Sequence, residues 1–189
     1  MCIRDRPKIS MNKYELEELI GEGQFSKVFK GIHKRKQTPI ACKMELLDQP
    51  FALLQHECKI LQYLYKEGCH FVPQILWYGL HNNYRCCVMQ LYDCDLGLYL
   101  QETNLTLKQK NKLFTQMINM IQHIHNHLVV HRDLKPENFM VANNELYLID
   151  FGLALFYTDE NQEHNENTYK EHIVGNRIYV SYFILDGNT

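Results

Sequence analysis

The chain has no long apolar segment, few glycines and prolines, and no C-x-x-C pair of cysteines. No apolar run approaches the roughly 20 residues that cross a bilayer, and the N-terminus lacks the apolar stretch of a secretory signal. The 9 glycines and 5 prolines among 189 residues are too few for a linker or a fibrous protein. We therefore expect one soluble intracellular protein, cytoplasmic, nuclear or both.

Cysteine spacing and net charge argue against further classes of protein and of binding partner. The seven cysteines form no C-x-x-C pair, which is typical of a reducing compartment rather than of a disulfide framework or a structural zinc site. The net charge is only −2, with 20 basic and 22 acidic residues well mixed. Such a balance creates no strong field, so we expect neither nucleic acid nor a membrane surface as partner, and the oligomeric state stays open.

Hydrophobic periodicity in the first half predicts a small antiparallel sheet with one helix. Short β-favouring runs separated by turns predict a three-stranded meander, and apolar residues at helical spacing then predict a helix with Pro50 in its first turn. Two more strands are joined by the turn-forming residues 81–83. The expected strands are 14–20, 27–32, 39–46, 74–80 and 85–91, and the expected helix is 51–65.

The second half is expected to be mainly helical. Thr106 and Gln109 form a capping box, and an apolar stripe from Leu113 to Leu128 predicts a long, well-buried helix. Two short strands are expected at 139–142 and 145–149. The polar stretch 157–171 has no period and is predicted to be a mobile loop, and residues 1–11 are predicted to be a disordered tail.

A glycine-containing turn is expected between the first two strands. Its backbone could fold over a triphosphate with N–H groups facing the oxygens, although an ordinary hairpin turn is the alternative. Val28 and the more distant Ala41 could supply apolar faces for a purine. The residues of the turn are Gly21, Glu22, Gly23, Gln24, Phe25 and Ser26, the last in place of the third glycine of the usual pattern.

A lysine in the third strand needs an acidic partner if it is buried. Lys43 follows Ala41 by two residues, and Glu57 lies on the next helix, on the side that carries its apolar residues. An ion pair between Lys43 and Glu57 could hold the ammonium against the α and β phosphates.

The most specific motif is His131-Arg132-Asp133-Leu134-Lys135-Pro136-Glu137-Asn138, followed by Asp150-Phe151-Gly152. The two runs together resemble eukaryotic protein kinases. The resemblance implies an α+β, two-lobed protein kinase-like fold. Residues 12–91 would form the nucleotide-binding lobe and residues 92–189 the beginning of the helical lobe.

The resemblance also implies roles for single residues. Asp133 would accept or orient the proton of the attacking hydroxyl, and Lys135 would neutralise charge on the migrating phosphoryl group. Asn138 and Asp150 would be oxygen ligands for Mg²⁺ bound with ATP. Lys135 at this position resembles the serine/threonine class, which implies protein substrates with Ser or Thr acceptors.

Several further stretches resemble the casein kinase 1 superfamily, which typically lacks an Ala-Pro-Glu motif, as this chain does. They are residues 55–60, 72–79, 138–140 and 175–181. In this alignment Met89 resembles the gatekeeper, and Gln90 to Tyr92 resemble the hinge whose backbone would bond adenine.

The activation segment departs from that family. Asn176 replaces a threonine that commonly supports the catalytic aspartate, and Arg177 is displaced by one position from an arginine that helps to bind a phosphate already present on the substrate. The chain also ends at Thr189, before the remaining helices of the family. A catalytically weak or inactive nucleotide-binding pseudokinase or scaffold fragment is therefore the alternative to an active kinase.

Four histidines near the end of the long helix look like a metal cluster by spacing alone. Only His123 and His127 share a helical face, at i and i+4. We interpret His131 as a packed residue beneath the catalytic loop, and His125 as an ordinary residue at the end of the helix.

Overall fold

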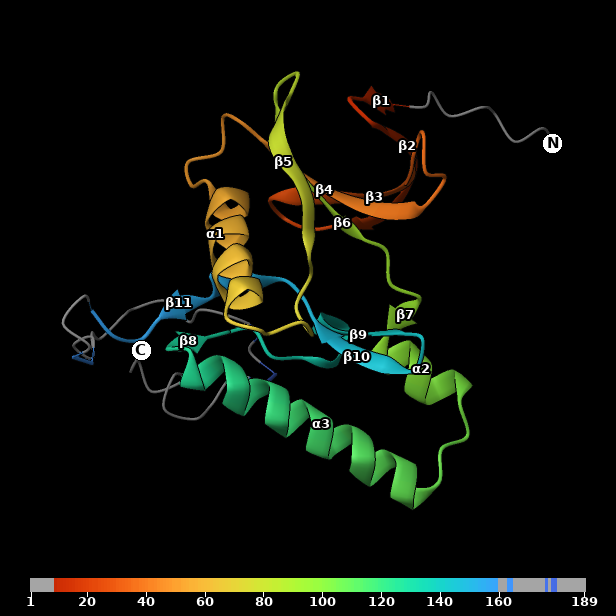
Figure 1. Ribbon diagram of the computed structural model, residues 1–189, viewed down its shortest axis with the longest axis vertical. Helices are drawn as coiled ribbons and strands as arrows, with labels where there is room; N and C mark the ends of the chain where they lie inside the picture. The colour runs from red at the N-terminus through yellow and green to blue at the C-terminus, as the bar shows by residue number, and fades with distance from the viewer. Residues whose placement is uncertain (1–8, 160–162, 165–175, 177, 180–189) are drawn as a thin grey trace. The chain divides into compact units, whose positions relative to one another are not determined.

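The computed structural model describes residues 9–159, 163, 164, 176, 178 and 179 (Figure 1). The chain divides into two compact units. The first contains the chain up to residue 58 together with residues 74–91, and the second contains residues 59–73 and the chain from residue 92 onward. Residues 59–73, which we expected in the first lobe, thus belong to the second unit. Each unit is described by itself below.

The first unit is built on a curled antiparallel sheet (Figure 1). The strands lie in the order β1-β2-β3-β4-β6-β5, and every neighbouring pair is antiparallel. The predicted meander and the later hairpin are confirmed. The strands are β1 (Ile9–Met11), β2 (Tyr14–Glu22), β3 (Ser26–His33), β4 (Pro39–Leu46), β5 (Ile75–His81) and β6 (Tyr84–Gln90).

The predicted disordered tail is too long at its C-terminal end. Ile9–Met11 form β1, which pairs with β2 so that Met11 lies opposite Tyr14. Met11 is 1% exposed and joins the core with Tyr14 and Leu16. Pairing and burial therefore order this segment, although three residues are too few to show a period in the sequence.

The two faces of the sheet have different partners. Because side chains alternate along a strand, Cys42 and Met44 point to the core that contains β1 and β2, while Lys43 points to the other face. On that other face, Cys87 packs against Leu54 of helix α1 (Leu53–Lys66). The helix begins at Leu53, later than predicted, so Pro50 lies in the preceding turn and not in the helix.

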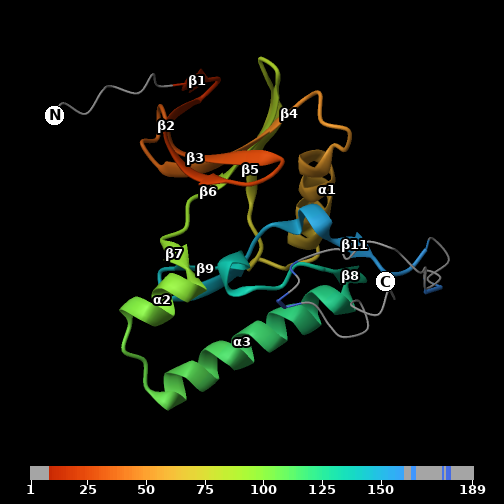
Figure 2. The same ribbon diagram turned by 180° about the vertical axis from the view of Figure 1, so that it is seen from behind.

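The described part of the second unit contains the C-terminal half of α1, two further helices and two small sheets (Figure 2). Strands β7 (Cys94–Asp95), β9 (Phe139–Ala142) and β10 (Glu145–Leu148) form one sheet in the order β10-β9-β7, and β8 (Val129–Val130) pairs with β11 (Leu155–Phe156) in the other. The helices are α2 (Leu96–Glu102) and α3 (Leu107–Asn126), and two 3-10 turns, η1 (Pro136–Asn138) and η2 (Phe151–Leu153), complete the unit.

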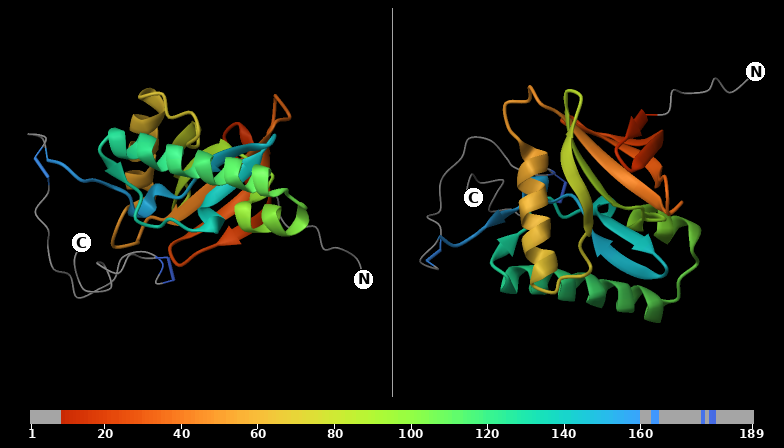
Figure 3. Two further views of the ribbon diagram at one scale, coloured as in Figure 1. Left: turned by 90° about the horizontal axis from the view of Figure 1, so that it is seen from below. Right: turned by 45° about the horizontal axis from the view of Figure 1, so that its top comes forward.

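Helix α3 begins as predicted but is much less buried than predicted. The capping box is confirmed: the Thr106 hydroxyl oxygen accepts from the Gln109 backbone N–H, and the Gln109 side chain accepts from the Thr106 N–H. Only Met120 and Ile124 of the helix are buried, whereas Phe114 is 55% and Ile118 64% exposed. In the described part of the chain, β8 and β10 contact α3 (Figures 1 and 3). Burial is therefore confined to the C-terminal turns.

The predicted mobile loop 157–171 lies mostly outside the described residues. Within it, Thr158 and His164 form an isolated antiparallel bridge. The described helices include none that is both long and apolar enough to span a membrane.

Candidate active site

The glycine-containing turn joins β2 to β3. Gly21 pairs with Val28 in the ladder, and the Gly23 backbone N–H donates to the Ser26 carbonyl at 2.9 Å. Glu22, Gly23, Gln24 and Phe25 are all exposed. The segment is therefore a hairpin turn, as the alternative expected. Whether it also binds phosphate depends on the residues that surround it.

The residues expected to face a purine share one face of the sheet. Val28 lies opposite Lys43 between β3 and β4, and Ala41 lies opposite Met89 between β4 and β6. Directly opposed residues in antiparallel strands point to the same face, as do residues two apart. Val28, Ala41, Lys43 and Met89 therefore line one surface of the first unit.

The boundary between the two units along the chain falls within the expected hinge residues. Gln90 ends β6 in the first unit, whereas Tyr92 belongs to the second. The Tyr92 ring packs on Tyr147 of β10, with centroids 4.7 Å apart.

Lys43 and Glu57 form the predicted ion pair. The Lys43 ammonium donates to Glu57 Oε2 at 2.7 Å, and the two side chains are 15% and 4% exposed. Low exposure makes this contact stronger than a surface pair, since solvent screens it less. The remaining exposure of Lys43 leaves part of its side chain accessible to a ligand.

A second buried pair on the same sheet has a structural role. Arg85 on β6 donates to Glu45 Oε2 at 3.3 Å, and Glu45 Oε1 accepts from the Leu54 backbone N–H at 3.1 Å. Glu45 thus satisfies one of the unpaired N–H groups in the first turn of α1. This pair fixes the start of the helix that carries Glu57.

The Asp133 carboxylate is the centre of a dense polar network in the second unit. Asp133 is 8% exposed. Its Oδ2 accepts from Lys135 Nζ at 2.6 Å and from Asn138 Nδ2 at 3.0 Å. Asn138 Nδ2 also donates to the Asp133 backbone carbonyl at 2.7 Å. The short turn η1 brings these three residues together although they are not adjacent in sequence.

His131 supports the network from below, as the sequence interpretation expected. It is 1% exposed, its Nδ1 accepts from the Asp133 backbone N–H at 3.3 Å, and its Nε2 lies 2.9 Å from the Ile149 carbonyl. The ring also meets Phe151 edge to face, with centroids 4.6 Å apart. Because Nδ1 is an acceptor, the ring is the neutral tautomer with the proton on Nε2. Burial lowers the pKa of His131 below its usual range, against the opposing effect of the Ile149 carbonyl.

Two residues of the motifs hold left-handed backbone conformations. Arg132 has φ 65° and Asp150 has φ 64°, values that cost free energy in residues other than glycine. The Arg132 guanidinium Nε donates to the Leu153 carbonyl at 2.7 Å, which ties the two motifs together. Strain held by surrounding contacts is common at functional sites.

The second unit offers oxygen ligands suited to a divalent cation. Asn138 directs its amide nitrogen at Asp133, which leaves Oδ1 as the acceptor end of the side chain. The Ile149 N–H donates to the Asn138 carbonyl at 2.9 Å, so the residue before Asp150 is bonded to Asn138. Hard oxygen donors of this kind fit a divalent cation that bridges phosphate oxygens.

A family model described as protein kinase domain matches residues 14–189. The chain belongs to the protein kinase domain family. The match covers both units, and the curled sheet with its few helices agrees with the α+β kinase fold expected from the motifs. Membership implies the use of ATP with a divalent metal and the transfer of phosphate to protein substrates.

Sequence reasoning on the kinase motifs missed several contacts. Asn138 was expected only as a metal ligand, but it also holds Asp133. The Arg132 contact with Leu153 and the Arg85–Glu45 pair were not foreseen either. Glu45 lies directly opposite Arg85 between β4 and β6, so opposite charges on two predicted strands were the available signal for the last of these.

The altered activation segment of the kinase domain is described only at a few positions. Asn176 Oδ1 accepts from the Ile178 backbone N–H at 2.9 Å, so it is engaged within its own turn. Arg177 and residues 165–175 lie outside the described residues.

His131 should make the stability of the kinase domain pH-dependent. Its folded-state pKa lies below the usual 6.5, so the unfolded chain binds a proton first as pH falls. This stabilising contribution is present above about pH 6.5 and is lost below it. His131→Phe should cost about 1–3 kcal/mol at pH 7.5, because the Ile149 carbonyl loses its donor. Urea unfolding at pH 7.5 and 5.5 should show the difference between wild type and variant shrinking at the lower pH. Parallel pH dependences would contradict this account.

Proposed function

We propose that this kinase domain is a serine/threonine protein kinase similar to casein kinase 1, transferring the γ-phosphate of Mg-ATP to hydroxyls of protein substrates. The observation that carries the proposal is the Asp133 carboxylate, bonded to Lys135 and Asn138 in a nearly buried position. A carboxylate held in this way is oriented to accept a hydroxyl proton, and the adjacent ammonium can stabilise charge on the transferred group.

In the first unit, the proposal assigns nucleotide binding to Lys43 and the surface around it. Glu57 holds the ammonium at 2.7 Å, which positions it for the α and β phosphates. The turn Gly21–Ser26 would cover the phosphates with its backbone. The apolar side chains of Val28, Ala41 and Met89, on the same sheet face as Lys43, would contact the purine.

Asn138 and Asp150 are proposed to hold the magnesium that accompanies ATP. The cation would neutralise charge on the phosphate oxygens. The support on the chain is the orientation of Asn138 Oδ1 away from Asp133 and the fixed left-handed conformation at Asp150.

The choice of serine and threonine rests on Lys135, which follows the His131-Arg132-Asp133-Leu134 run as it does in the serine/threonine class. The casein kinase 1 likeness rests on residues 55–60, 72–79, 138–140 and 175–181. Because Arg177 is displaced in the last of these, we do not assign this chain a preference for pre-phosphorylated substrates.

Replacing Lys43 should weaken nucleotide binding specifically. Lys43→Met removes a charged hydrogen-bond donor to phosphate, which should raise the Kd for Mg-ATP about 10- to 100-fold in isothermal calorimetry. Arg85→Met is the matched control, because it also leaves a buried carboxylate without its cation, but in a pair that has a structural role at the start of α1. Equal losses in the two variants would assign the effect to stability and remove Lys43 from the site.

Replacing Asp133 should separate transfer from binding. Asp133→Asn keeps the shape of the side chain but removes the base, so phosphate transfer to casein should fall about 10²- to 10⁴-fold while the thermal shift with Mg-ATP is retained. Asp95→Asn is the control, since Asn replaces Asp well at the N-cap of α2.

The outcomes distinguish an active kinase from a nucleotide-binding scaffold. An unchanged transfer rate in Asp133→Asn would remove Asp133 from catalysis. A wild-type chain that binds Mg-ATP without transferring phosphate to any acceptor protein would support the nucleotide-binding scaffold instead.

A further inference from the structure

The structure brings together three potential metal ligands in the second unit, away from the kinase motifs. One donor atom each from Cys69, His123 and His127 lies within 4.8 Å of the others. Cys69 follows the end of α1, and the two histidines lie at the end of α3. The sequence alone therefore does not indicate that the three residues are close together. The sequence analysis considered only the spacing of the histidines relative to one another.

The histidine pair has the geometry of a helical chelate. His123 and His127 are four residues apart, and their rings lie 4.9 Å apart at the C-terminal end of α3. Their location also favours a cation, since the carbonyl end of a helix carries partial negative charge.

Hydrogen bonding prepares His127 as a ligand. Its Nδ1 lies 2.8 Å from the His123 carbonyl, a contact that requires a proton on Nδ1 and leaves the lone pair on Nε2. Metal-bound histidines commonly donate their other ring N–H to a carbonyl in this way. The His127 carbonyl in turn accepts from the Tyr63 hydroxyl at 3.3 Å, which fixes the end of the helix.

Cys69 adds a sulfur ligand to the pair. Its Sγ lies 3.9 Å from His127 Nδ1, the ring nitrogen that donates to the His123 carbonyl, and one nitrogen of each histidine lies within 4.8 Å of Sγ. Cys69 is fully buried. The backbone is held by the bond from Cys69 N–H to the Leu64 carbonyl at 3.0 Å. Zinc–sulfur and zinc–nitrogen bonds of about 2.3 Å and 2.0–2.1 Å place tetrahedral ligands roughly 3.5 Å apart. The three donor atoms, which lie within 4.8 Å of one another, would therefore move closer together on binding the metal.

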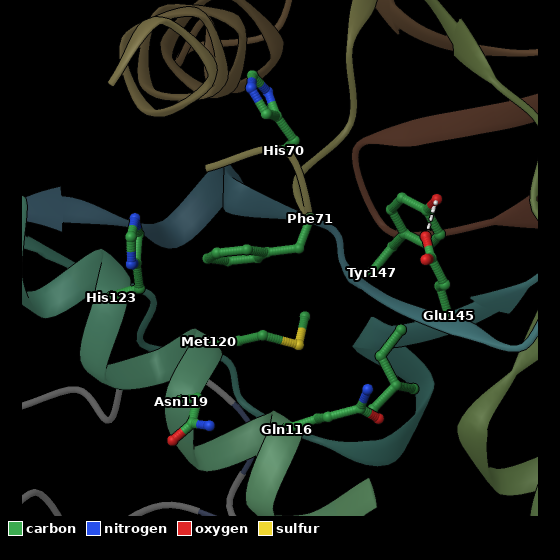
Figure 4. Close-up of a pocket in the computed structure, with 9 residues that line it drawn as sticks. His70, Phe71, Gln116, Asn119, Met120, His123, Glu145 and Tyr147 are labelled. Carbon is green, nitrogen blue, oxygen red and sulfur yellow. Dashed lines mark hydrogen bonds between the residues drawn. The ribbon is translucent and has the colours of Figure 1, made fainter. Parts of the chain in front are cut away.

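His123 supplies the route to solvent. It is exposed, and its ring meets Phe71 edge to face with centroids 5.7 Å apart. Figure 4 shows His123 projecting from α3 beside Phe71, on the wall of a pocket of about 430 Å³ that also includes Met120. A water molecule could complete the coordination on this open side.

We propose that Cys69, His123 and His127 form a binding site for a divalent transition metal of the zinc class. One thiolate and two imidazoles form a ligand set that zinc and cobalt accept and that magnesium does not favour. The metal would fasten the connection after α1 to the end of α3, four residues before His131. This proposal is independent of kinase activity.

Cobalt titration of the chelator-treated chain, without nucleotide, tests the site. Co²⁺ should bind with a thiolate-to-cobalt absorption band in the near ultraviolet, which oxygen ligands such as Asn138 and Asp150 cannot produce. The band should disappear in Cys69→Ser and persist in Cys94→Ser. Zn²⁺ should displace Co²⁺ and abolish the band.

His123→Ala keeps the test independent of folding, because this side chain is exposed. It should weaken Co²⁺ binding by more than about 100-fold. His125→Ala, on the same helical turn but a different face, should bind as the wild type does. Absence of the band in the wild type, its persistence in Cys69→Ser, or equal binding by the His123→Ala and His125→Ala variants would each overturn the proposal.

Discussion

The buried carboxylate of Asp133 is the constraint on which the second unit depends. Asp133 is only 8% exposed, and a carboxylate in such a position is stable when it is paired and hydrogen-bonded. Lys135 and Asn138 meet that need through Oδ2. His131 fixes the backbone at Asp133 from the other side. The 3-10 turn η1, the hairpin of β9 and β10, and the strained conformation at Arg132 all serve to bring these groups to one place.

The first unit also contains buried carboxylates, and their cation partners have two different roles. Glu57 and Glu45 are both buried carboxylates, and each is paired with a cation from β4 or β6. Glu45 uses its second oxygen to begin α1, so its pair is part of the framework. Glu57 holds an ammonium on the sheet face that also carries Val28 and Ala41, which makes this pair the one suited to a ligand. The same electrostatic contact thus supports structure in one place and, in our proposal, nucleotide binding in the other.

Local sequence patterns predicted the elements whose signals are local. Alternation and turns located the meander. The capping box could likewise be predicted, since Thr106 and Gln109 lie within one helical turn. The Lys43–Glu57 pair could be predicted because a buried lysine needs an acidic partner and Glu57 lies on the apolar side of the predicted helix.

Other features depend on contacts that a single sequence does not display. Strand β1 is too short to have a period, and its order comes from pairing with β2. The burial of α3 depends on what covers each turn, so an apolar residue such as Ile118 can follow the stripe and still be exposed. Cys69 and His127 are 58 residues apart, and only the fold makes them neighbours.

The most direct test of the central claim is a double-mutant cycle on the rate of phosphate transfer, using Lys135→Met, Asp133→Asn and the double variant. If the two side chains act as one unit through their 2.6 Å contact, the double variant should be about as slow as the slower single variant. Rate losses that multiply would show that the residues act independently and would contradict the account.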